Sequence, residues 1–182
     1  MALSSDLYIS TYVRVLLNKA LKICLTDKLS KEQIREKKRE IWKEFHDRTN
    51  KMEKGPTFGA SFMTRLAVLT HAIYNQVDSL VESEAEQRKL TTAIIWEIYW
   101  RVSMPYWRIT RLISKGPIKR LHYAMNFYIK CFPYRKPGYN MEILTDETKI
   151  GESFAFNVYH CPPAAYFKKH GLSQLCLDSW CN

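Results

Sequence analysis

Cys161 is the residue with the clearest potential for chemistry in this 182-residue chain. It lies in the C-terminal segment FAFNVYHCPPAAYFKKHGLSQLCLDSWCN and directly precedes Pro162 and Pro163. Proline suits the first position of a helix, where its missing N–H costs nothing. Cys161 would then occupy or adjoin the N-cap, where free N–H groups and the helix dipole favour a thiolate. Three hypotheses follow: a nucleophile, a metal ligand or a packed structural thiol.

The residues before Cys161 alternate in a way that is typical of a β-strand, in which every second side chain lies on the same face. One face is mainly apolar, and we expect it to face the core: Phe154, Phe156, Val158 and His160. The other face is small and polar, and it can line a pocket or face water: Ala155, Asn157, Tyr159 and Cys161. A histidine at the end of such a core face is more often packed than catalytic.

The cysteine spacing argues against a metal site. Cys161, Cys176 and Cys181 are separated by 14 and 4 residues, whereas structural zinc sites use a tight cysteine pair and a second pair. His160 and Cys161 are adjacent in the strand and point apart, so they cannot easily bind the same ion. Cys176 falls on an apolar helical face, where burial is expected. We expect neither a bound metal nor a cofactor.

The elements that must position these residues are mainly helical. Apolar side chains recur at helical spacing, and Ser30 with Gln33 and Ser83 with Glu86 have the pattern of a capping box. The predicted long helices cover residues 6–25, 31–52, 62–80 and 84–104. Pro105 and the Gly116-Pro117 pair should then separate two shorter helices.

The character of the chain changes after the turn-rich stretch PYRKPGYN. Residues 141–144 and 154–160 have strand chemistry and flank the polar loop TDETKIGE. A short helix should run from Pro162 to His170, with Gly171 directly after it, and another helix should start near Ser173. We therefore predict an α+β fold in one folded unit. A mainly helical portion, residues 1–135, precedes a small portion, residues 136–182, with an antiparallel sheet, the Cys-Pro motif and short C-terminal helices.

Charge and composition limit the classes of molecule that the chain can bind. The net charge is +10, and the block from Arg101 to Pro137 holds nine lysines and arginines but no acidic residue. This block can bind a carboxylate, a phosphate, nucleic acid or a lipid surface, or it can be a solvated face of amphipathic helices. The N-terminus lacks the pattern of a signal peptide, and no apolar run is long enough to span a membrane. An odd number of cysteines without a secretion signal favours free thiols and a cytoplasmic protein.

The C-terminal segment resembles the corresponding segment of the L-2-amino-thiazoline-4-carboxylic acid hydrolases. The matching residues are Asn157, Cys161, Pro162, Gly171 and Cys181. The family pattern continues past the second cysteine with more helix and a final strand pair, whereas this chain stops at Asn182. We therefore expect either a C-terminally truncated chain or a reduced member of the family.

The resemblance implies a cysteine-dependent hydrolase of sulfur amino-acid metabolism. Its substrate would be a small cyclic isothiourea that bears a carboxylate, and its product a carbamoyl-cysteine or a related compound. Cys161 would attack the ring carbon between nitrogen and sulfur. His160 or Tyr159 would move the proton, and Asn157 and Cys181 would contact the substrate.

The spacing of the motif residues limits which of them one substrate can contact. Asn157 lies four residues before Cys161, about 13 Å along a strand, so one small ring can touch both only where the strand bends. An arginine of the acid-free block, Arg108 or Arg111, would hold the substrate carboxylate. The contact from Asn157 and the role of the arginine rest on residue type and not on the family.

Alternative functions remain open. One is a non-catalytic module on the same scaffold that binds a small anion or regulates, with Cys161 merely packed. Arginine and lysine interleaved with aromatic residues can also bind nucleic acid, but no zinc-finger, RNP-like or helix-turn-helix pattern is present, so this partner is not expected. The same stretch can lie on an anionic membrane as a basic amphipathic helix. A homo-oligomer is also open.

Overall fold

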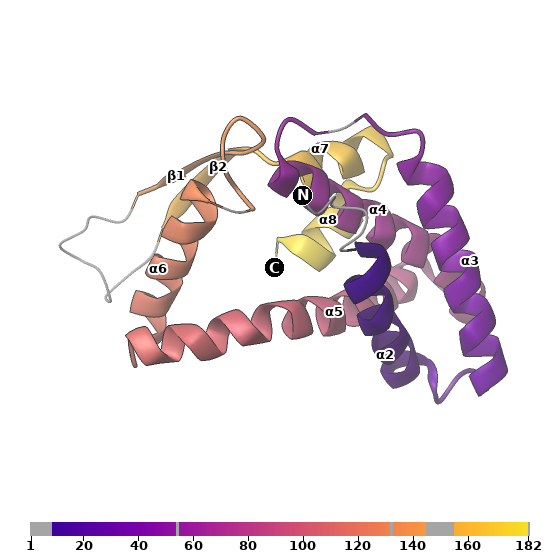
Figure 1. Ribbon diagram of the computed structural model, residues 1–182. Helices are drawn as coiled ribbons and strands as arrows, with labels where there is room; N and C mark the ends of the chain where they lie inside the picture. The colour runs from indigo at the N-terminus through magenta and orange to yellow at the C-terminus, as the bar shows by residue number, and fades with distance from the viewer. Residues whose placement is uncertain (1–8, 54, 132, 145–154, 182) are drawn as a thin grey trace.

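The computed structural model describes residues 9–53, 55–131, 133–144 and 155–181 (Figure 1). These residues are mostly helical, with one two-stranded antiparallel sheet and short C-terminal helices. The predicted α+β class is therefore confirmed. None of the helices in the described ranges is long and apolar enough to cross a membrane.

The N-terminal helices begin as the sequence predicts, with one difference. A short π-helical turn, η1 (Ile9–Val13), leads into α2 (Arg14–Leu25). Helix α3 (Lys31–Thr49) begins after Ser30, whose hydroxyl accepts the Gln33 N–H at 3.3 Å. The Gln33 side chain accepts the Ser30 N–H at 2.8 Å in return, so the predicted capping box is present.

Helix α4 (Phe58–Val77) is the central helix and is followed by a 3-10 turn, η2 (Asp78–Leu80). It begins four residues before the predicted start because the Thr57 hydroxyl accepts the Ala60 N–H at 3.1 Å and caps the helix there. Helix α4 contacts α3 on one side and a C-terminal helix on another, and most of its side chains are buried.

Helix α5 (Glu84–Ile113) continues through Pro105, where the sequence predicted a break. Proline removes one intrahelical donor, the N–H that would bond to the Arg101 carbonyl. Pro105 lies on the exposed side of α5, where water can replace that donor. At the other end, the Ser83 hydroxyl accepts the Glu86 N–H at 3.3 Å, but the Glu86 carboxylate accepts the Glu82 N–H instead of completing a capping box.

The last elements return the chain to the helical core. Helix α6 (Pro117–Lys130) is followed by β1 (Asn140–Ile143), which pairs antiparallel with β2 (Phe156–His160). The helices α7 (Pro162–Lys169) and α8 (Ser173–Trp180) then pack on α4 and α5. Gly171 has a φ of +72° after α7, which is the left-handed conformation expected of the residue beyond a helix end. The predicted polar loop, residues 145–152, lies outside the described residues.

The predicted core face of β2 is wrong. Phe156 and Val158 are 41% and 48% exposed, and every residue of the strand is exposed; Phe154 lies outside the described residues. Alternation fixes which side chains share a face, but burial needs a second layer over that face. Among the described elements the sheet has two strands, and the buried side chain it contributes to the core is Met141 of β1.

Two hydrophobic clusters hold the described residues together. The main cluster combines the apolar faces of α2, α3, α4 and α5 with Tyr166 and Phe167 of α7 and Leu175 and Cys176 of α8. The smaller cluster joins α4, α6 and β1 and consists of Ala60, Met125, Tyr139 and Met141. Cys161 is partly buried and packs against this cluster. In Figure 1, α6 and the sheet lie to one side, while α7 and α8 lie over the helical core.

Gly59 provides a test of the contact between α4 and the turn after α6. An added Cβ at Gly59 would lie 2.8 Å from both the carbonyl carbon and the Cα of Pro133, so the backbones would have to separate. We expect Gly59→Ala to lower the free energy of unfolding by about 1–3 kcal/mol, measured by urea denaturation. Gly116→Ala is the control, since its nearest atoms lie 3.8 Å away. Equal losses in the two variants would contradict the close approach.

Candidate functional site

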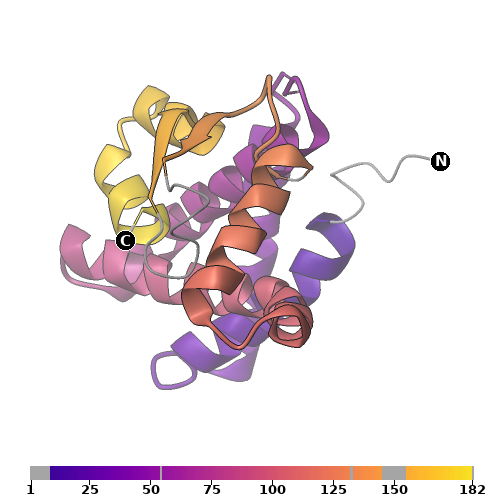
Figure 2. The same ribbon diagram turned by 90° about the vertical axis from the view of Figure 1, so that its left-hand side faces the viewer.

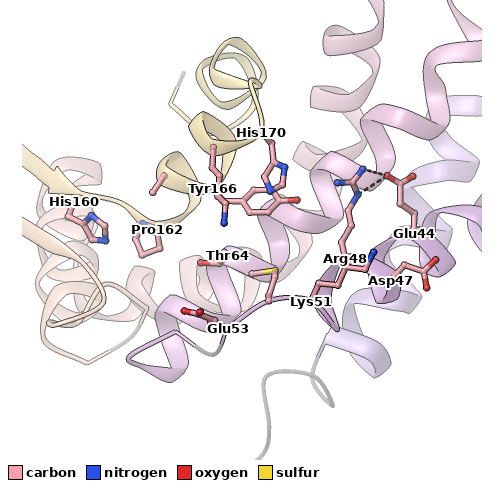
Figure 3. A pocket seen from close by; sticks show the side chains of 13 residues that line it. Glu44, Asp47, Arg48, Lys51, Glu53, Thr64, His160, Pro162, Tyr166 and His170 are labelled. Carbon is pink, nitrogen blue, oxygen red and sulfur yellow. Dashed lines mark hydrogen bonds and ion pairs between the residues drawn. The ribbon is translucent and has the colours of Figure 1, made fainter.

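A cavity of about 800 Å³ lies between the C-terminal part of α3, α4 and α7 (Figure 3). Its wall holds both signs of charge: Arg48, Lys51 and Lys169 as cations, and Glu44, Asp47 and Glu53 as carboxylates. Thr64, Tyr166, His160 and His170 add groups that can donate or accept hydrogen bonds. The cavity therefore offers partners for both ends of a zwitterionic molecule.

Helix α3 supplies one wall because its apolar stripe is thin and leaves its other side chains to water and the cavity. Glu44 and Arg48 are one turn apart, and the Arg48 Nε donates to the Glu44 carboxylate at 2.8 Å. Asn75 and Gln76 of α4 donate to the same carboxylate at 2.6 and 2.8 Å. Burial alone would raise the pKa of Glu44, but these hydrogen bonds outweigh it and the pKa lies below its usual value.

A buried hydrogen bond connects α4 to α7 at the back of the cavity. The Nδ1 of His71 lies 2.9 Å from the Tyr166 hydroxyl, and His71 is only 7% exposed. Burial, together with repulsion from Arg48 and His170, lowers the pKa of His71 to about 4. Burial also raises the pKa of Tyr166, although Arg48 opposes this shift. At neutral pH the pair is therefore an uncharged imidazole beside a protonated phenol.

His170 extends this pair toward the solvent. Its ring lies 4.4 Å from the ring of Tyr166 and 5.3 Å from that of His71. Burial, followed by repulsion from Arg48 and Lys169, lowers the pKa of His170. Tyr166 and His170 line the cavity, whereas His71 does not line it and contacts it through Tyr166.

Cys161 is the N-cap of α7 and Pro162 occupies the first turn, as predicted. The predicted lowering of the thiol pKa is wrong. Burial raises the pKa of Cys161, and neighbouring Cys181 adds to this, whereas the Ala164 N–H and the Tyr139 hydroxyl only partly oppose it. Cys161 is partly buried against the smaller cluster. It is not among the described residues that line the cavity, although its neighbours His160 and Pro162 are.

Of the other residues predicted from the motif, His160 lines the cavity, whereas Tyr159, Asn157 and Cys181 do not. Tyr159 is 60% exposed, and its hydroxyl donates to Glu142 at 2.8 Å and accepts from Asn157 at 3.2 Å. Asn157 and Tyr159 therefore share a face of the sheet as expected, but their partner is Glu142 of the other strand. Cys181 is exposed at the end of α8 and interacts with Cys161 and Cys176.

The two predicted carboxylate-binding arginines also lie elsewhere. Arg108 lines a separate depression of about 480 Å³ with Lys19 and Arg101. Arg111 is exposed one turn further along α5. Neither residue lines the cavity beside α7, where the cations come from α3 and α7.

Sequence reasoning missed the residues at the centre of the site: Glu44, Arg48, His71 and Tyr166. One signal was available, since His71 lies in the mainly apolar run from Leu66 to Ile73 and must find a polar partner there. Glu44 and Arg48 also have the spacing of an ion pair on a helix. Nothing local, however, connects His71 to Tyr166, which is 95 residues away in the sequence.

No protein-family model, no curated protein and no solved structure matches the chain. The resemblance to the amino-thiazoline carboxylate hydrolases therefore stays a prediction that depends on its matching residues. The function has to be inferred from the geometry and charge of the site.

His71 predicts a pH dependence of stability. Its pKa is about 4 in the folded chain and 6.5 ordinarily, so the unfolded chain binds the proton first as the pH falls. The free energy of unfolding should therefore decrease by about 2 kcal/mol as the pH falls from 6.5 to about 4, after allowance for screening by water in the cavity. Urea denaturation at several pH values measures this pH dependence of the free energy of unfolding.

His71→Gln should remove this part of the pH dependence. Tyr166→Phe is the matched control, since it breaks the same hydrogen bond but leaves the imidazole in place. An unchanged pH profile in His71→Gln would show that His71 is not the responsible group.

Proposed function

We propose that the cavity between α3, α4 and α7 binds a small zwitterionic ligand, one that carries a carboxylate and an amine or amidine group. The observation that supports this proposal is the set of unpaired charges on its wall. Within the described part of the chain, Lys51, Lys169, Asp47 and Glu53 line the cavity without an ion-pair partner. A zwitterion can pair with both kinds of charge at once.

Partial enclosure makes these charges useful for binding. A hydrogen bond between oppositely charged groups is stronger than a neutral one, and it strengthens further where water is partly excluded. Arg48 is already held by Glu44, so it is positioned in advance and loses little side-chain freedom on binding. Lys51 and Lys169 then remain for the ligand carboxylate, and Asp47 and Glu53 for its cationic end.

Ligand titrations test this proposal. We expect 2-amino-thiazoline-4-carboxylate or an α-amino acid to bind saturably in calorimetry, and acetate or methylammonium alone to bind much more weakly. Lys169→Gln should weaken binding about tenfold, which is the loss of about 1.4 kcal/mol, because it removes one cation from the wall. Lys168→Gln is the matched control, since Lys168 is exposed but does not line the cavity. Equal weakening by both variants, or no saturable binding, would refute the proposal.

The second candidate is hydrolysis of a cyclic isothiourea by Cys161. The observation in its favour is that Cys161 lies between two residues of the cavity wall, His160 and Pro162, at a helix N-terminus where the Ala164 N–H favours the thiolate. The thiol would have to turn from the smaller cluster toward the cavity before it could react.

The reaction would proceed in two steps. In the first, the Cys161 sulfur bonds to the ring carbon between nitrogen and sulfur, the ring carbon–sulfur bond breaks, and the thiol proton moves to the leaving sulfur. In the second, water attacks the carbon of the adduct and its bond to Cys161 breaks. The released product is a carbamoyl-cysteine. One proton of the water restores the Cys161 thiol, and the other goes to the product nitrogen.

Thiol reactivity and turnover test this candidate. Because Cys161 is partly buried with a raised pKa, we expect exposed Cys131 and Cys181 to alkylate before it at neutral pH, as mapped by mass spectrometry. If Cys161 is the nucleophile, ring opening of 2-amino-thiazoline-4-carboxylate is lost in Cys161→Ser and kept in Cys131→Ser. Turnover that survives Cys161→Ser would exclude this role.

A further inference from the structure

The end of α5 and the start of α6 form a corner at the edge of the molecule (Figures 1 and 2). The two helices are joined by the short turn around Gly116. In Figure 1 this corner lies on the opposite side of the molecule from α3, which supplies a wall of the cavity. A partner at the corner would therefore not use the cavity described above.

The corner carries cations without acidic neighbours in the sequence. The block from Arg101 to Pro137 has nine lysines and arginines and no acidic residue. Arg101 is held by Glu97 at 3.0 Å. Four further cations are exposed and make no ion pair with any residue in the described ranges: Arg108, Arg111, Lys115 and Lys119.

Apolar side chains are exposed among these cations. Leu112 is 88% exposed, the highest value among the exposed large hydrophobic residues of the described chain, and Ile109 is 59% exposed. On α6, Leu121, Tyr123 and Phe127 are 36%, 39% and 50% exposed. Large hydrophobic side chains gathered in one exposed region mark an interaction surface.

Cations and apolar groups share the same helix faces. Arg108 and Leu112 are one turn apart on α5. On α6 the spacing of three and four residues places four exposed side chains in one stripe: Lys119, Tyr123, Phe127 and Lys130. A partner that contacts one of these stripes therefore meets positive charge and apolar surface together.

We propose that the α5–α6 corner binds the surface of a membrane that contains anionic lipids. Lipid phosphates and carboxylates pair with the exposed cations, and Leu112 and Ile109 enter the boundary between headgroups and acyl chains. Since no helix of the described residues can cross a membrane, the contact is peripheral. The two most exposed apolar side chains of the corner, Leu112 and Ile109, are aliphatic. They favour a membrane over nucleic acid, because leucine and isoleucine do not stack on bases as aromatic residues do.

Vesicle sedimentation of the full chain tests this proposal. We expect the protein to bind vesicles of phosphatidylcholine with about 30% phosphatidylserine at least tenfold more strongly than vesicles of phosphatidylcholine alone. Binding should weaken as salt screens the cations. Equal binding to both vesicles, or binding to neither, would overturn the proposal.

Matched variants locate the contact. Arg111→Gln with Lys115→Gln should reduce binding to anionic vesicles several-fold, whereas Lys28→Gln with Lys31→Gln removes the same charge from an exposed part of the chain outside the block and should change it little. Leu112→Ser should leave the fold intact, since that side chain is exposed, and should weaken the binding that remains at high salt. Equal losses from the two charge variants would overturn the assignment to the corner.

Competition between an oligonucleotide and anionic vesicles distinguishes a nucleic-acid partner from a membrane. A single-stranded oligonucleotide that binds the protein while anionic vesicles do not would overturn the membrane assignment. Anionic vesicles that displace the oligonucleotide, with displacement at high salt weakened in Leu112→Ser, would support it, because only the membrane contact needs the apolar side chain.

Discussion

The packing of α7 on α4 is the constraint on which the candidate site depends. Its polar centre is the hydrogen bond between His71 and Tyr166, 2.9 Å long and formed between residues far apart in the sequence. Around it, Phe167 is fully buried in the main cluster. Docking of α7 brings Lys169 and His170 opposite the charged face of α3 and so creates the cavity. A histidine as deeply buried as His71 needs such a partner, because an unpaired buried polar group is costly.

Burial and hydrogen bonding compete at Glu44 and at Cys161, and the number of donors decides the result. Glu44 is partly buried, yet three side chains donate to it and its pKa falls. Cys161 has the Ala164 N–H and the Tyr139 hydroxyl in its favour, and burial still raises its pKa. At His71, burial and repulsion from Arg48 and His170 all disfavour the charged form, so they lower its pKa together. A position at a helix start is therefore insufficient to produce a thiolate where the thiol is also desolvated.

Local chemistry in the sequence predicted local structure well. Ser30 and Gln33 form the expected capping box, Gly171 ends α7, and Cys161 is the expected N-cap. The errors arise where burial depends on distant parts of the chain. The alternation in β2 indicated a core face, but whether another layer covers that face is a tertiary property that no window of the strand contains. Likewise, Pro105 breaks a helix by local rules, yet on an exposed face the packing of the rest of α5 outweighs one lost hydrogen bond.

The net charge of +10 is distributed unevenly, and this separates the two proposed surfaces by mechanism. In the cavity, three cations face three carboxylates, so its long-range field is weak and selectivity must come from short-range pairing with a ligand of matching geometry. At the α5–α6 corner, nothing in the local sequence offsets the cations, and their field reaches roughly 8–10 Å into physiological salt. A broad anionic surface is attracted by such a field, whereas a neutral zwitterion is not. The two sites can therefore act on one chain without competing. The balanced charges of the cavity do not attract an anionic membrane, and the cations of the α5–α6 corner do not attract a neutral zwitterion.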